Sequence, residues 1–181
     1  MRNFSILFTS AIFLGAVCIV SAQAQDVMKT AKVGTMKVEL HVLAAEPFFT
    51  ADEVTAKKVT EGMLIVGGAA PLAPDAESRP NHHLVVHVFD AKTGKAITNT
   101  KVTMSFQSLD AKGKPASAST DVPVVVMQAI GKGEQSTHYG NNVVMPAGQY
   151  AVALVINGRK CAFKVSVSDA SSGSMNGMDM H

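Results

Sequence analysis

Apolar and polar residues alternate one by one along three separate segments of this chain of 181 residues. The segments are Thr35–Leu43, Lys101–Gln107 and Lys160–Val167. Successive side chains of a β-strand point to opposite faces of its sheet. An alternation with a period of two therefore predicts strands with one buried face.

Shorter apolar runs between turn residues predict further strands, at Met63–Val66, His83–Phe89, Val122–Met127, Asn142–Met145 and Tyr150–Ile156. Asn157-Gly158 predicts a tight hairpin, because both residues tolerate a positive φ. Only Thr50–Thr60 looks helical, with Thr50 as the N-cap and Glu53 in the capping-box position. About eight short strands at regular spacing predict an all-β fold, an immunoglobulin-like antiparallel β-sandwich in a single domain.

The N-terminal residues 1–24 have the pattern of a secretory signal peptide: Arg2, an uncharged apolar run from Ile6 to Val20, and a cleavage site at Ala22-Gln23-Ala24. The run is shorter than the ~20 apolar residues that a membrane span needs. We therefore expect a cleaved signal peptide, a β-sandwich domain at 25–168 in the periplasm with no membrane span, and a flexible tail containing Met and His at 169–181.

The net charge, the cysteine content and the motifs narrow the classes of function that the sequence supports. A formal net charge of +2 gives no argument for nucleic acid or for an anionic membrane surface as a partner. Cleavage after residue 24 would leave Cys161 as the one cysteine, so no intramolecular disulfide is expected. Neither a Gly-x-Ser-x-Gly, a His-Glu-x-x-His nor a Cys-x-x-Cys motif occurs, and an enzyme is the least supported class.

Six histidines and ten methionines, without tryptophan, suggest a transition-metal site. Imidazole and thioether together suit copper, because soft sulfur selects Cu(I). The alternative is that the methionines fill the core and the histidines lie on the surface. His83 and His87 are four residues apart in a strand, roughly 13 Å, too far to share one ion. Of these two we favour His83 as a ligand. His87 is a secondary candidate ligand, because a histidine deeper in a strand is more often a partly buried structural residue.

Met127 and His138 flank a connection between two predicted strands. If those strands pair, the two side chains come close together, which makes them candidate ligands. Met145 is seven residues beyond His138, roughly 20 Å in an extended chain, and is expected in the core. His41 alternates outward and is expected to be solvated, while Cys161 lies on an apolar face as a small hydrophobe without the neighbouring His of a blue-copper site.

The C-terminal tail is a second candidate metal site. Three thioethers and an imidazole there could wrap Cu(I), from Met175, Met178, Met180 and His181.

The segment His138-Tyr139-Gly140-Asn141-Asn142-Val143-Val144-Met145, followed by Gly148-Gln149-Tyr150, resembles the periplasmic iron-transport family found beside ferrous-iron permeases. The resemblance implies a copper-binding immunoglobulin-like sandwich that assists iron uptake, a homodimer, and an inner-membrane permease as partner. It places the copper ligands on His83, Met127 and His138. The sequence departs from the family pattern at Val85, where the family has an acidic residue, and at Val155, where it has a further histidine.

A weaker resemblance, carried by Phe89–Val102, is to exported sandwich modules with a YtkA-like domain. The sequence as a whole predicts a periplasmic protein that binds a transition metal, with copper as the bound ion and iron as the alternative, and that assists iron or copper uptake or handling. The competing hypothesis is a non-metal interaction module of immunoglobulin-like type that docks on a membrane partner. An oxidoreductase that cycles copper would need a further ligand.

Overall fold

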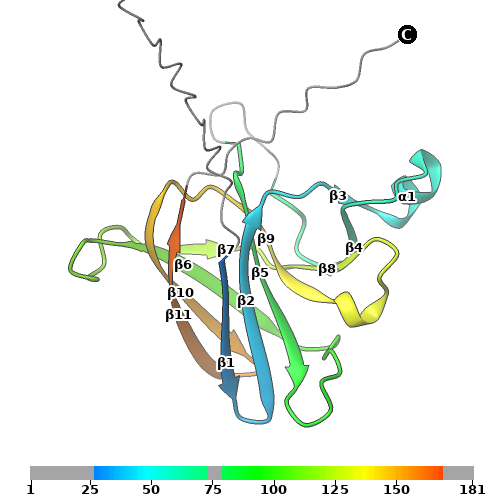
Figure 1. Cartoon of the computed structure of the whole chain (residues 1–181). Coiled ribbons are helices and arrows are strands. Elements are labelled where there is room, and N and C mark those ends of the chain that lie inside the picture. The colour runs from blue at the N-terminus through cyan, green and yellow to red at the C-terminus, as the bar shows by residue number, and fades with distance from the viewer. Residues whose placement is uncertain (1–26, 73–78, 169–181) are drawn as a thin grey trace, which may run out of the picture.

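The computed structural model describes residues 27–72 and 79–168, which form two packed β-sheets and one short α-helix (Figure 1). The predicted all-β, sandwich-like single domain is confirmed. The strands are β1 (Val27–Val33), β2 (Met36–Ala44), β3 (Phe48–Phe49), β4 (Met63–Gly68), β5 (His82–Asp90), β6 (Val102–Leu109), β7 (Thr120–Val122), β8 (Val125–Ala129), β9 (His138–Val143), β10 (Gly148–Ile156) and β11 (Arg159–Val167). The α-helix is α1 (Ala51–Lys57), and a 3-10 turn, η1 (Glu134–Ser136), precedes β9.

The signal peptide predicted at 1–24 and the tail predicted at 169–181 lie outside the described residues. Within the described ranges, no helix is both long enough and apolar enough to span a membrane.

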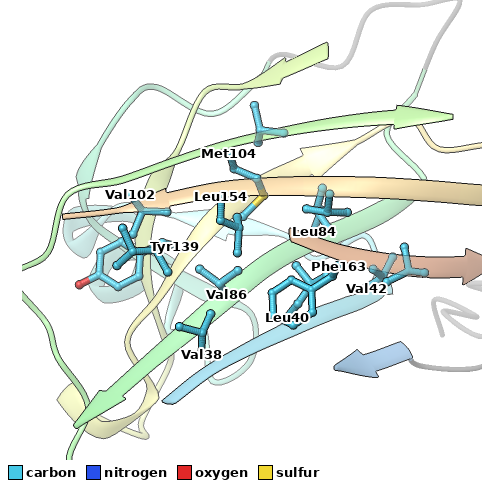
Figure 2. Packing of buried hydrophobic residues seen from close by; sticks show 14 of the residues in the cluster. Val38, Leu40, Val42, Leu84, Val86, Val102, Met104, Tyr139, Leu154 and Phe163 are labelled. Carbon is cyan, nitrogen blue, oxygen red and sulfur yellow. The ribbon is translucent and has the colours of Figure 1, made fainter. Parts of the chain in front are cut away.

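The larger sheet has seven strands in the order β1-β2-β5-β9-β8-β4-β3, and the smaller has four in the order β11-β10-β6-β7. Adjacent strands are antiparallel except β3 and β4, which are parallel. The core lies between the sheets (Figure 2). There Leu40 and Val86 of the larger sheet face the side of the smaller sheet that carries Leu154 and Phe163. The alternation read from the sequence is thus the alternation between this core and the outer face of each sheet.

The strand predicted at Val122–Met127 is wrong as a single element. β7 ends at Val122 in the smaller sheet, and β8 begins at Val125 in the larger one. Pro123 lies between them, and because proline has no N–H it cannot continue a strand ladder. The side-chain amide of Asn141 donates to the Pro123 carbonyl at 2.7 Å, which anchors this crossover to β9.

The strand count is also higher than the eight predicted, since the described residues contain eleven strands. β1 and the two-residue β3 were not predicted. β9 runs from His138 to Val143, rather than over Asn142–Met145.

Two local predictions are confirmed. The Thr50 side chain accepts from the Glu53 N–H at 3.3 Å, and Glu53 accepts from the Thr50 N–H at 3.0 Å, so α1 begins with a complete capping box. Asn157 and Gly158 have φ of 48° and 79°, and they close the tight hairpin that pairs Ile156 with Arg159.

Candidate metal centre

Three of the predicted ligands, His83, Met127 and His138, share the outer face of the seven-stranded sheet, the face away from the core. His138 is the register partner of Met127 across β9 and β8, and His83 is the register partner of Asn142 across β5 and β9. Facing residues of antiparallel strands have Cβ atoms about 5 Å apart, so Met127 and His138 are neighbours, as the predicted strand pairing implied. His83 and Met127 are fully buried, and His138 is 3% exposed.

His83 and His138 approach each other through their Nε2 atoms, which lie 3.4 Å apart. The other ring nitrogen of each histidine, Nδ1, is hydrogen-bonded to an oxygen atom. His83 Nδ1 lies 2.9 Å from Asn142 Oδ1, and His138 Nδ1 lies 2.8 Å from the Ser136 carbonyl oxygen. Both rings are thus oriented by their surroundings, in the way that outer hydrogen bonds orient metal-binding histidines.

These hydrogen bonds also decide which nitrogen carries the proton. The Ser136 carbonyl can only accept, so His138 Nδ1 must donate. The Asn142 amide nitrogen donates to the Glu46 carbonyl at 2.7 Å, which leaves its Oδ1 facing His83 and requires His83 Nδ1 to donate as well. In the neutral rings both Nε2 atoms therefore carry lone pairs, and the two lone pairs face each other without a proton between them.

β3 and the connection that leads to it from β2 cover His83. Phe48 packs edge-on against the His83 ring, with ring centroids 5.6 Å apart. The Glu46 N–H donates to Asn142 Oδ1 at 3.3 Å, which ties this connection to the same amide that orients His83. The site is consequently shielded from water by a segment that the strand pattern did not predict.

Burial lowers the pKa of His83 to about 4; the neighbouring His138 ring lowers it further, and the Asn142 hydrogen bond opposes the shift. Burial also lowers the pKa of His138, against the effect of its hydrogen bond to the Ser136 backbone. Both rings are neutral near pH 7, which is the protonation state that can bind a metal.

The metal-free protein is expected to lose stability between pH 6.5 and pH 4. Unfolded His83 binds a proton below about pH 6.5, whereas the folded residue does so only near pH 4. The unfolded state therefore binds more protons in this window, so the free energy of unfolding falls as the pH falls, by about 3 kcal/mol for His83 alone. Urea denaturation at pH 7, 5.5 and 4.5 measures this slope. His83→Gln should reduce the slope without abolishing it, because burial also lowers the pKa of His87 to about 4. A wild-type stability that does not change over this range would contradict the assignment.

His87 and His41 lie beside the His83–His138 pair and form a cluster of four histidines with it. The ring centroids of His87 and His138 are 5.1 Å apart, and those of His87 and His41 are 5.0 Å apart. Sequence spacing excluded His87 from a site containing His83, but the His138 ring lies close to both, with its centroid 5.5 Å from that of His83 and 5.1 Å from that of His87. The expectation that His41 is solvated is wrong, because its side chain is only 21% exposed and packs beside His87.

A small apolar cluster separate from the main core surrounds Met127. It consists of Val85, Val125 and Met127, with Phe48, Met63 and Ile65 packed against it. Met145, by contrast, is fully buried in the main core, as predicted. The tail ligands Met175, Met178, Met180 and His181 lie outside the described residues.

Gly140 lies on β9 between His138 and Asn142. It pairs with Val85 of β5 on one side and with Val125 of β8 on the other. A Cβ at this position would overlap the Leu84 carbonyl oxygen and would come within 2.8 Å of Val85 Cα. The absence of a side chain lets β5 and β9 approach closely at the point where His83 and His138 converge.

Among the described residues, no group of three or more His, Cys, Asp or Glu side chains is arranged to hold a metal ion. A site here therefore rests on the two imidazoles, with the thioether of Met127, the register partner of His138, as a soft neighbour. No protein-family model matches the chain, and comparison with curated proteins and with solved structures gives no match.

Proposed function

We propose that this chain is an exported protein that binds a soft transition-metal cation, copper foremost, as an accessory to metal uptake or handling. His83 and His138 would bind the ion through Nε2, and Met127 would supply a thioether that favours Cu(I). For the fold, we propose the immunoglobulin-like type of sandwich.

The observation that carries the proposal is the pair of opposed Nε2 lone pairs 3.4 Å apart. Two nitrogens that bind one tetrahedral ion at 2.0–2.1 Å are about 3.3 Å apart, so a cation between these atoms fits the spacing. The alternative is one shared proton. The lowered pKa of each ring disfavours it near neutral pH.

Titration of the purified protein with Cu(I) under anaerobic conditions, and with Cu(II) in air, tests this proposal. We expect one ion per chain, held more tightly as Cu(I). An absence of stoichiometric binding at micromolar metal would reject the proposal and would leave the non-metal interaction module.

Met127→Leu is expected to weaken Cu(I) binding by about tenfold or more while changing Cu(II) binding little, because leucine keeps the buried volume but removes the soft ligand. Competition against a coloured Cu(I) chelator measures the change. Met145→Leu is the matched control, since Met145 is equally buried but lies in the main core. Equal losses in the two variants would mean that Met127 acts through packing and does not bind the ion.

A further inference from the structure

A row of four imidazoles connects the buried pair to the surface. Successive ring centroids are 5.5 Å apart from His83 to His138, 5.1 Å from His138 to His87, and 5.0 Å from His87 to His41. The row crosses β5, β9 and β2 on one face of the sheet. It begins at His83, which is fully buried, and ends at His41, whose side chain is 21% exposed.

A carboxylate stands at the outer end of this row. Glu39 Oε2 lies 3.8 Å from His41 Nε2, and Glu39 is the register partner of His87. A hydrogen bond from Lys37 is the largest effect that lowers the pKa of Glu39, so the group is charged near neutral pH. Lys37 Nζ contacts the other carboxylate oxygen, Oε1, at 2.8 Å, and leaves Oε2 directed toward the row.

The His41 ring carries an unsatisfied nitrogen. Its Nε2 is buried and has no hydrogen-bond partner among the described residues. A buried polar atom without a partner costs free energy. In the tautomer that leaves the lone pair on Nε2, a cation passing between His41 and Glu39 would supply the missing partner.

We propose that Glu39, His41 and His87 form an access path along which the metal cation reaches the His83–His138 pair. This inference rests on the proposed function. Two imidazoles that bind one ion from opposite sides have centroids about 6 Å apart. The observed separations of 5.0–5.5 Å therefore let neighbouring rings share an ion after small ring movements. The ion can then move inward by exchanging one ligand at a time, so that at every step it keeps at least one protein ligand.

The positions along the path are suited to transit rather than storage. No three His, Cys, Asp or Glu side chains converge to hold an ion in the described part of the chain, and the path also lacks the thioether that Met127 offers beside the His83–His138 pair. One nitrogen of His87 is also engaged by the Thr137 backbone, which leaves this residue a single ligand atom. Removal of a transit residue should therefore change how fast the ion arrives and leaves, but not how tightly it is held at the end.

The test measures loading and release of Cu(I) in His41→Phe and His87→Phe, which keep an aromatic ring and remove the nitrogens. Loading is followed by mixing metal-free protein with a coloured Cu(I)–chelator complex, and release by challenging loaded protein with excess chelator. We expect both rates to fall by about tenfold or more while Kd stays within about twofold, because an unchanged equilibrium requires equal effects on the two rates. Thermal unfolding of each variant checks that the fold is intact.

Glu39→Gln should slow loading in the same assay, most at low ionic strength, because it removes the charge that attracts the cation. Asp121→Asn is the matched control: it removes one exposed carboxylate from β7 of the other sheet and should load at the wild-type rate. Equal slowing by both variants would mean that the loading rate depends on the net charge of the protein and not on the position of Glu39. That result would overturn the path.

The remaining outcomes separate this inference from the proposed function. Wild-type rates in His41→Phe and His87→Phe, with normal binding, would overturn the path and leave the buried site standing. A large rise in Kd in these variants would make the two residues ligands of the final site, which also overturns the path. A wild-type protein that binds no metal would reject the proposed function itself.

Discussion

His83→Ala is expected to lower the affinity for Cu(I) by at least about 100-fold, because it removes one of the two opposed ligands. Loss of a residue that only hydrogen-bonds to a metal ligand already costs about 10–100-fold in affinity. The remaining His138 Nε2 would then face a cavity rather than a second nitrogen. Competition titration against a Cu(I) chelator of known affinity measures the loss, and thermal unfolding confirms that the variant is folded.

His82→Ala is the matched control for this variant. His82 precedes His83 on the same strand and is also buried, but its side chain points to the opposite face of the sheet. It should leave the affinity within about threefold of the wild type, well under the 1.4 kcal/mol of a tenfold change. If His83→Ala binds normally and removal of residues 175–181 abolishes binding, the ion is held by the tail and the pair has another role.

Gly140→Ala is expected to destabilise the fold by about 3 kcal/mol or more, at the upper end of what overpacking costs. The added methyl group would overlap the Leu84 carbonyl oxygen, which belongs to a strand backbone and cannot turn aside like a flexible side chain. β5 and β9 must separate to accept it, and this breaks the ladder at the point where the two histidines meet. The midpoint of urea denaturation measures the effect, and Cu(I) affinity should fall in any variant protein that remains folded.

Gly67→Ala on β4 provides the comparison. A Cβ at Gly67 meets nothing within 4 Å, and its φ is not positive, so this change should alter stability by less than about 1 kcal/mol. Similar midpoints for the two variants would show that β5 and β9 yield easily at Gly140, contrary to the contact geometry.

The sequence predicted those parts of the fold that depend on neighbours along the chain. Alternation located β2, β6 and β11, the capping box located α1, and Asn157-Gly158 located its hairpin. The assignment of strands to sheets was not predictable in this way, because it depends on partners far apart in sequence. The crossover at Pro123 illustrates this: the proline marks a break in the apolar run from Val122 to Met127, but the sequence does not show that the two halves join different sheets.

The members of the candidate site could be proposed one by one from the sequence, but their arrangement as a cluster could not. The position of His138 beside Met127 follows from pairing across a single connection, which the sequence makes visible. His41 joins the cluster only because β2 lies beside β5, and Asn142 orients His83 only because β9 lies on the other side. Spacing along one strand gives the separation of His83 and His87, but it does not show that His138 of the neighbouring strand lies close to both rings.

Leu84 and His83 are adjacent on β5, yet one packs in the core and the other belongs to the candidate site. The same holds on β9 for Tyr139 and His138. Deleting a single residue within either strand would exchange the two faces and place imidazoles in the core and aliphatic groups outside. Over evolutionary time, this cluster can therefore change through substitutions and through altered loop lengths. Insertions or deletions within its strands would remove folding and binding together.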